Sequence, residues 1–168
     1  MSGHPALVAL AAKLDGFVAR VEARHGDQLR CAPGCAACCQ VALTITAVEA
    51  DAIRAWAAEQ PAAARAALAE HAGAATPARC AALDASERCR IYPVRPLVCR
   101  SHGVPIRLGR GTAAITACEL NFTAAGPAAA DPDCVLDQEL VSTTLGVIDR
   151  AAGGGPREDL AAVLASLA

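Results

Sequence analysis

Apolar positions recur every three or four residues near the start of the chain, which is the period of a helix with one buried face. Pro5 suits the first turn of such a helix, so the pattern predicts a helix over residues 5–25. A coiled-coil partner is the alternative use of this face, although the repeat is too short to favour it. The apolar stripe consists of Leu7, Leu10, Leu14, Phe17 and Val21.

Two further helices are predicted between residues 46 and 72. The sequence Thr-Ala-Val-Glu at 46–49 has the form of a capping box, in which Thr46 accepts a bond from the amide of Glu49 and the Glu49 side chain reaches back. The helix that starts here is expected to run to about Gln60, because Pro61 cannot continue it. The alanine-rich segment 62–72 predicts the next helix.

The C-terminal part predicts two more helices. Residues 134–150 read as a helix, and after the Gly-rich break at 153–155 we expect Pro156 to open a last helix. The first carries Leu136, Leu140, Thr143 and Val147 on one side, and the last carries Leu160, Val163, Leu164 and Leu167.

The middle of the chain has little periodicity. Residues 41–45 suggest a short extended piece, residues 73–105 contain four prolines, and residues 104–116 predict a β-hairpin that turns at 109–111. A long irregular segment is uncommon in a compact domain unless something holds it. We therefore expect a mainly α fold with a small β-hairpin, in which helices flank an irregular, cysteine-rich, metal-stapled core. One domain would cover 1–168, with the cysteine-cluster core at 27–121 and C-terminal helices at 134–168.

Composition narrows the function classes. The 168 residues are 54% hydrophobic but only 2% aromatic, so we expect a core made mostly of Ala, Leu, Val and Ile, in which each side chain contributes less than an aromatic one would. A net charge of −2 argues against a general polyanion binder. No apolar run reaches transmembrane length, and charges interrupt the N-terminal apolar pattern, so we expect neither a membrane partner nor a signal peptide. A cytoplasmic location follows as an expectation.

Nine cysteines dominate the candidate chemistry: Cys31, Cys35, Cys38, Cys39, Cys80, Cys89, Cys99, Cys118 and Cys134. The count is odd and a cytoplasmic chain keeps its thiols reduced, so disulfides are disfavoured and metal binding leads. A thioredoxin-like redox pair would need a βαβ context, which the pattern lacks.

The segment 31–40 places four thiols together. Cys35 and Cys38 form a C-x-x-C pair that suits one metal, and Cys31 can close over the same site. On an extended backbone the adjacent side chains of Cys38 and Cys39 would point apart. Cys38 and Cys39 would then bind two neighbouring metals or different irons of one cluster, or one of the two thiols would pack in the protein without binding metal.

A second thiol-bearing segment lies at 89–100, with Cys80 before it and Cys118 after it. Pro93 and Pro96 stiffen the path between Cys89 and Cys99, which makes a preorganised chelate. The alternative is a proline-rich surface turn with two buried thiols.

Residues 79–110 hold seven arginines and two acidic residues, a local balance of +5. Guanidinium groups would offset the negative charge of a thiolate–metal site and lower thiol pKa values. A solvated basic face or a nucleic-acid patch is the alternative, although the scarcity of aromatic rings to stack on bases makes nucleic acid an unlikely partner. The arginines are Arg79, Arg88, Arg90, Arg95, Arg100, Arg107 and Arg110.

The motifs "CAPGCAACC", "CRIYPVRPLVCRSHG" and "CELN" together resemble the bacterial YkgJ-like cysteine-cluster family, the zinc- or iron-chelating CxxCxxCC domain, over about residues 31–121. Three residues rather than two separate Cys31 from Cys35, so this spacing departs from the family pattern. The resemblance implies metal ligation by Cys35, Cys38, Cys39, Cys80, Cys89, Cys99 and Cys118. It also implies that Tyr92, Arg95, Pro96 and Arg100 support these ligands or frame them. The same motif occurs in flagellin lysine N-methylases, where it is associated with an iron–sulfur cluster.

Four further cysteine and histidine residues are assigned individually. Cys31 is kept as a ligand on proximity, and His102 is a candidate extra ligand because it lies three residues after Cys99. Cys134 is assigned a structural role, and His25 is expected at the surface.

The favoured function is binding of zinc or iron, with an iron–sulfur cluster as one form of the cofactor, and without catalytic machinery. The alternatives are an iron–sulfur redox or methyl-transfer accessory enzyme, and a zinc-folded module that binds a partner protein or nucleic acid.

Overall fold

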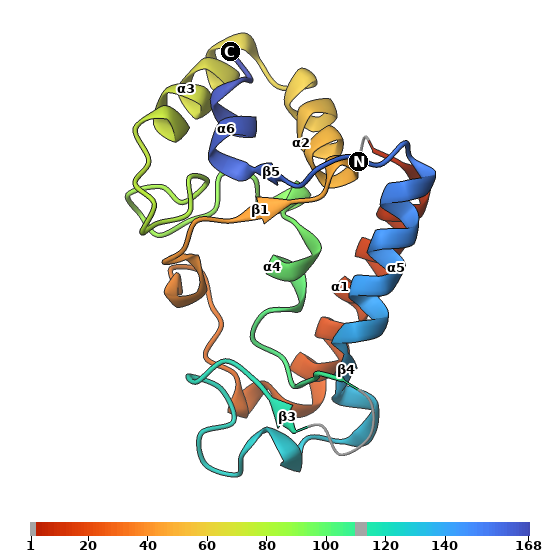
Figure 1. Cartoon of the computed structure of the whole chain (residues 1–168). Coiled ribbons are helices and arrows are strands. Elements are labelled where there is room, and N and C mark those ends of the chain that lie inside the picture. The colour runs from red at the N-terminus through yellow and green to blue at the C-terminus, as the bar shows by residue number, and fades with distance from the viewer. Residues whose placement is uncertain (1–2, 110–113) are drawn as a thin grey trace. The chain divides into compact units, whose positions relative to one another are not determined.

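The computed structural model describes residues 3–109 and 114–168 (Figure 1). Helices dominate this part of the chain and the strands are all two residues long, so the mainly α class with a small β element is confirmed. The helices are α1 (Pro5–His25), α2 (Ala47–Ala58), α3 (Ala62–Gly73), α4 (Leu97–Ser101), α5 (Gln138–Ala151) and α6 (Leu160–Ala165). The strands are β1 (Thr44–Ile45), β2 (Ile106–Arg107), β3 (Ile115–Thr116), β4 (Leu136–Asp137) and β5 (Glu158–Asp159).

The chain divides into two compact units, each built from segments that are distant in sequence. Unit 1 contains the residues up to Val8, Pro33–Pro96 and Ile148–Ala168. Unit 2 contains Ala9–Ala32 and Leu97–Val147. Both units carry cysteines of the two predicted thiol-bearing segments, so each is described by itself.

An aliphatic core holds unit 1 together. Ile45, Ile53, Ile91, Leu160 and Leu164 are fully or almost fully buried in it, and α3 packs along α6 (Figure 1). Each such side chain contributes about 1.5–3 kcal/mol on burial. The antiparallel pairing of β1 with β5 brings the C-terminal segment onto this core.

The boundaries of α2 follow the predicted signals. The capping box is present, and the Glu49 carboxylate accepts bonds from the Thr46 amide at 3.0 Å and the Thr46 hydroxyl at 2.9 Å. The helix ends at Ala58, and Pro61 stands directly before α3. The predicted helices at 5–25, 46–60 and 62–72 are therefore confirmed.

The two C-terminal helices begin later than the sequence pattern predicted. Residues 132–137 form a 3-10 turn, η5 (Pro132–Cys134), and then β4, so α5 starts at Gln138. Pro156 does not open the last helix, because Glu158 and Asp159 first pair with β1. The Asp159 carboxylate then caps α6 by accepting from the Ala162 amide at 3.0 Å.

The apolar face that the sequence predicted for the helix at 134–150 was also wrong. Leu136 belongs to β4 rather than to the helix, so its position does not set the helical phase. Leu140 and Val147 are 64% and 53% exposed, and the buried residues of α5 are Val141 and Ile148.

Unit 2 is organised around a smaller core of Val21, Val104, Phe122, Ala130 and Cys134. A three-stranded sheet of order β3-β2-β4 lies in this unit. The β2–β3 pair confirms the predicted hairpin, whose turn at 109–111 extends beyond the described residues. The parallel third strand β4 and the short helix α4, inside the segment expected to be irregular, were not predicted.

Among the described residues, no helix is both long enough and apolar enough to cross a lipid bilayer.

Replacement of Ile53 tests the unit 1 core. Ile53→Ala should lower the free energy of unfolding by about 2–5 kcal/mol, because the side chain is fully buried and leaves a cavity. Leu140→Ala, at a position 64% exposed, should change it by less than about 0.5 kcal/mol. Urea unfolding followed by circular dichroism measures both, and equal losses would contradict the assignment of this core.

Candidate metal centre

The predicted thiol ligands are distributed over both units. Cys35, Cys38, Cys39, Cys80 and Cys89 lie in unit 1, and Cys31, Cys99 and Cys118 lie in unit 2. No disulfide joins any of the nine cysteines, all of which are among the described residues.

The adjacent cysteines of unit 1 lie on a tight turn rather than on an extended backbone. A 3-10 turn, η2 (Ala37–Cys39), is closed by the Cys39 amide, which donates to the Ala36 carbonyl at 2.9 Å. Successive side chains on a 3-10 helix are about 120° apart, since it has three residues per turn. The Cys38 and Cys39 sulfurs are therefore only 4.0 Å apart. The expectation that these side chains point apart was wrong because its premise, an extended backbone, does not hold.

A second segment joins this turn through the backbone. The Cys80 amide donates to the Cys39 carbonyl at 2.8 Å, so the two cysteines are held next to each other across 41 positions of sequence. From Cys80 the chain makes a loop that returns at Cys89, which forms a β-bridge with Leu83. Cys80 and Cys89 both pack against the unit 1 core.

The loop between Cys80 and Cys89 is fixed by one carboxylate. Asp84 accepts bonds from the amides of Ser86 at 2.7 Å and Arg88 at 3.0 Å. The Arg88 amide is the largest of several influences that hold the pKa of the Asp84 carboxyl below its usual range. A charged Asp84 thus stiffens the turn that returns the chain to Cys89.

Cys89 shares its surroundings with two other predicted ligands. Burial raises the pKa of the Cys89 thiol, and the nearby thiols of Cys80 and Cys38 raise it further. The Ile91 amide and the Arg95 guanidinium act in the opposite direction but are outweighed. Arg95 thus lowers the pKa of the Cys89 thiol as expected of an arginine, but the net shift is upward because desolvation is the larger effect.

In unit 1, the Cys38 and Cys39 sulfurs are thus 4.0 Å apart, Cys80 is bonded to Cys39 through the backbone, and the thiols of Cys80 and Cys38 are near enough to Cys89 to act on its pKa. Four thiolates are the donor set of structural zinc sites and of iron–sulfur clusters. At a Zn–S length of about 2.3 Å, tetrahedral geometry separates two sulfurs by about 3.8 Å, close to the 4.0 Å between Cys38 and Cys39. The donor set fits such a metal. Cys35 stands in the same unit, half-buried in the loop before η2.

The residues expected to support these ligands are ordered by local contacts. The Arg95 guanidinium lies 3.9 Å from the centre of the exposed Tyr92 ring and donates to the Tyr92 carbonyl at 3.0 Å. This stacking holds Arg95 where its charge acts on Cys89. Arg79 instead pairs with Glu87 at 2.9 Å, and Arg90 donates to the Ala67 carbonyl at 2.9 Å.

In unit 2, a buried asparagine holds Cys31. The Asn121 side-chain NH₂ donates to the Gly103 carbonyl at 2.7 Å and to the Cys31 sulfur at 3.3 Å, and its carbonyl oxygen accepts from the Arg30 amide at 2.8 Å. The Asn121 amide donates to the Cys118 carbonyl at 2.8 Å. Asn121 thus ties Cys31 to Gly103 through its side chain and to the Cys118 carbonyl through its own backbone amide.

Gly103 is required by this packing. Its φ is +100°, and a Cβ added there would stand 2.7 Å from the Cys31 sulfur and 3.2 Å from the Asn121 amide nitrogen. Any side chain at this position would displace the thiol. The sequence contained a signal for this contact, since His-Gly and Cys-Glu-Leu-Asn are parts of its motifs, but Asn121 was not predicted as a site residue.

The remaining predicted residues of unit 2 lie on α4, in the turn after it and after β3. Cys99 is half-buried on α4, and Cys118 is half-buried after β3. Arg100 is buried and donates to the Asp15 carboxylate at 2.6 Å, which anchors α4 to α1. His102 lies in an exposed turn after α4, and its role as an extra ligand stays a prediction.

One group of metal-ligating side chains was missed by the sequence analysis. His25, Asp131 and Cys134 each offer a ligand atom, and these atoms lie within 4.8 Å of one another. His25 is half-buried rather than at the surface as expected, and Cys134 is fully buried. No spacing rule joins residues more than a hundred positions apart, so only the fold could reveal this group.

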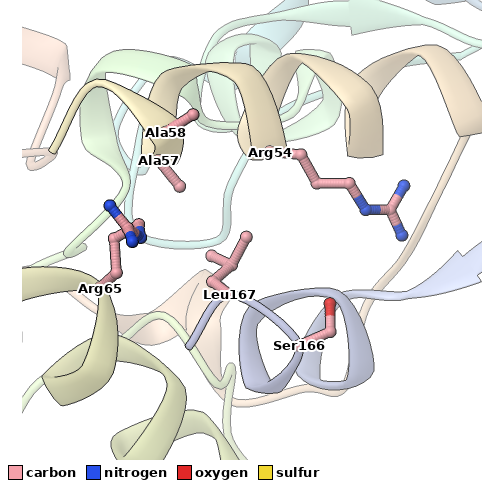
Figure 2. A pocket seen from close by; sticks show the side chains of 6 residues that line it. All are labelled: Arg54, Ala57, Ala58, Arg65, Ser166 and Leu167. Carbon is pink, nitrogen blue, oxygen red and sulfur yellow. The ribbon is translucent and has the colours of Figure 1, made fainter. Parts of the chain in front are cut away.

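A shallow groove of about 410 Å³ in unit 1 does not resemble a site (Figure 2). Arg54 and Arg65 line it together with Ala57 and Leu167. Figure 2 shows the Arg54 guanidinium directed away from Leu167. That guanidinium pairs with Glu158 and Asp51, and its hydrogen bond holds the pKa of the Glu158 carboxyl below its usual range.

Comparison with known proteins identifies the family of this chain. No curated protein and no solved structure matches the chain. A family model, CxxCxxCC, described as a "putative zinc- or iron-chelating domain", matches residues 30–119, which is more than half of the chain. The matched range includes all the cysteines except Cys134. The chain therefore belongs to the CxxCxxCC family of zinc- or iron-chelating domains.

Proposed function

We propose that this protein binds zinc or iron through its clustered cysteines, and that Cys38, Cys39, Cys80 and Cys89 form the centre of the site in unit 1. The observation that carries the proposal is the convergence of these thiols from two segments of unit 1. Two of the sulfurs are 4.0 Å apart, and the backbone bond between Cys80 and Cys39 fixes the segments to each other. Cys35, from the C-x-x-C pair, is proposed as a further ligand.

Within unit 2, Cys31, Cys99 and Cys118 are proposed as further thiol ligands of the protein, and Asn121 is assigned a positioning role. An N–H group that donates to sulfur stabilises the thiolate form and orients it, as outer partners of metal ligands generally do. Asn121 is 3% exposed and makes this contact with Cys31 while it is held by Gly103 and Arg30. The contact supports Cys31 as a ligand despite its unusual spacing from Cys35.

Metal binding without turnover is the function that these surroundings favour. A catalytic metal needs an open position and a nearby general base. Glu87, the carboxylate nearest Cys89 in sequence, is paired with Arg79 at 2.9 Å and is part of the loop that returns to Cys89. Bound metal would instead add folding free energy to a chain with few large apolar residues, since metal ligands are assembled only in the folded state.

Anaerobic purification followed by elemental analysis and a visible spectrum tests the proposal and identifies the metal. Stoichiometric zinc in a colourless protein would assign a thiolate zinc site. Iron and sulfide with a brown colour would assign an iron–sulfur cluster. A protein that takes up neither metal, when both are supplied under reducing conditions, would overturn the proposal.

Cysteine-to-serine replacement on η2 tests the unit 1 ligands. Cys38→Ser and Cys39→Ser should each weaken metal binding by more than about 100-fold, which is the upper end of the loss for an outer partner. Competition with a chelator measures the affinity. Ala37→Ser adds the same hydroxyl to the same exposed turn and should leave the affinity unchanged. If either cysteine variant binds metal as tightly as the unchanged chain, that thiol is not a ligand.

Two glycine variants test the role of Cys31. Gly103→Ala places a methyl group 2.7 Å from the Cys31 sulfur and should weaken metal binding by about 10–100-fold. Gly126→Ala is the matched control: its φ is +77°, but nothing lies within 4 Å of its added Cβ. Both variants incur backbone strain of about 1–2 kcal/mol, so only the effect on metal affinity separates them. Equal affinities would remove Cys31 from the ligand set.

A further inference from the structure

A second group of possible ligands lies outside the segment matched by the family model, in unit 2. His25 is the last residue of α1, and Asp131 and Cys134 lie at and within η5. Their ligand atoms lie within 4.8 Å of one another, with His25 Nε2 and Asp131 Oδ2 3.7 Å apart. We propose that these three side chains bind a divalent transition metal, with zinc as the expected ion, independently of the cysteine motif.

The chemistry of the three donors selects the metal. An imidazole nitrogen, a carboxylate oxygen and a thiolate sulfur form a mixed set of the kind that zinc accepts, whereas magnesium and calcium prefer oxygen alone. A thiolate and a carboxylate also neutralise the two positive charges of the ion. Three protein ligands leave a fourth tetrahedral position for water.

His25 Nε2 acts as a hydrogen-bond acceptor in the structure. The Asp131 amide donates to His25 Nε2 at 3.2 Å, so this nitrogen presents its lone pair. A bond of this length is at the weak end of the range, and a metal at the same nitrogen would replace it. The Phe122 ring, whose centre is 5.6 Å from that of the imidazole, packs beside His25.

The thiol is held in position by the core and by its own turn. Cys134 is fully buried among Val21, Val104 and Phe122, and its amide donates to the Asp131 carbonyl at 2.8 Å. This bond closes η5 and sets the spacing between Asp131 and Cys134. An apolar surrounding on one side strengthens metal–thiolate attraction, because little water competes.

Two arginines of α1 attach η5 to the helix that carries His25. Arg24 donates to the carboxylates of Asp131 at 3.2 Å and Asp133 at 2.7 Å, and Arg20 donates to the Asp133 carbonyl at 3.2 Å. The three ligands are therefore brought together by contacts that do not depend on a metal. Preorganisation of this kind lowers the entropic cost of binding.

Zinc stoichiometry of the full chain tests this site. After equilibration with zinc under reducing conditions, His25→Gln and Cys134→Ala should each bind one equivalent less than the unchanged chain. Asp27→Asn is the matched control, because it removes an exposed carboxylate two residues after His25 that is not part of the group, and it should retain the full stoichiometry. Circular dichroism confirms that each variant is folded, and His25→Gln is the decisive variant because the glutamine carbonyl can still accept from the Asp131 amide.

The test is separable from that of the cysteine motif. In a Cys38→Ser and Cys80→Ser background, the unit 2 group should still bind one equivalent of zinc, and Cys134→Ala should abolish it. With cobalt in place of zinc, this remaining equivalent should show a thiolate-to-metal absorption band that disappears with Cys134→Ala. Unchanged zinc stoichiometry in both His25→Gln and Cys134→Ala would overturn the proposal and leave a hydrogen-bonded histidine–aspartate pair beside a packed thiol.

Discussion

The candidate site of unit 1 depends on the hydrogen bond from the Cys80 amide to the Cys39 carbonyl. Neither segment forms a long helix or strand at this point, and the chain has few large apolar residues with which to fix loops by burial. A backbone bond positions the main chain directly, whereas a side-chain contact positions it only through rotatable bonds. The thiols of Cys38, Cys39 and Cys80 then follow from the local turns on either side of this bond.

In unit 2, a side chain rather than the backbone fixes the irregular segments to one another. Asn121 uses both its carbonyl and its NH₂ group to join the segments that carry Arg30, Gly103 and Cys118. A buried amide with satisfied partners specifies one arrangement, because any displacement leaves polar groups without hydrogen bonds. Irregular segments that carry ligands are thus held by polar contacts, and the aliphatic cores hold the helices.

Much of the helical structure could be predicted because its signals are local. Pro5, the Thr46–Glu49 capping box and Pro61 mark boundaries within one or two turns of the helices that they limit. The delayed starts of α5 and α6 could not be predicted, because β4 and β5 pair with strands far away in sequence and two residues show no period.

The candidate site was predictable in composition but not in geometry. The cysteine pattern indicated which thiols are candidate metal ligands, and the family match covers the same segment of the chain. The conformation of η2 reversed the expected divergence of Cys38 and Cys39, because a turn of three residues is too short to show a period in the sequence. Asn121 and His25 were missed because their partners are 90 and 109 positions away.

The pairing of β1 with β5 has a consequence for the order of events during synthesis. Thr44 pairs with Asp159, and Leu160 and Leu164 complete the core on which Cys80 and Cys89 pack. Unit 1 therefore cannot close until more than a hundred further residues have left the ribosome. Contacts of such long sequence separation form slowly, because the loop must be closed before they are gained. The thiols of residues 35–89 thus remain accessible to ions, oxidants and chaperones throughout that interval.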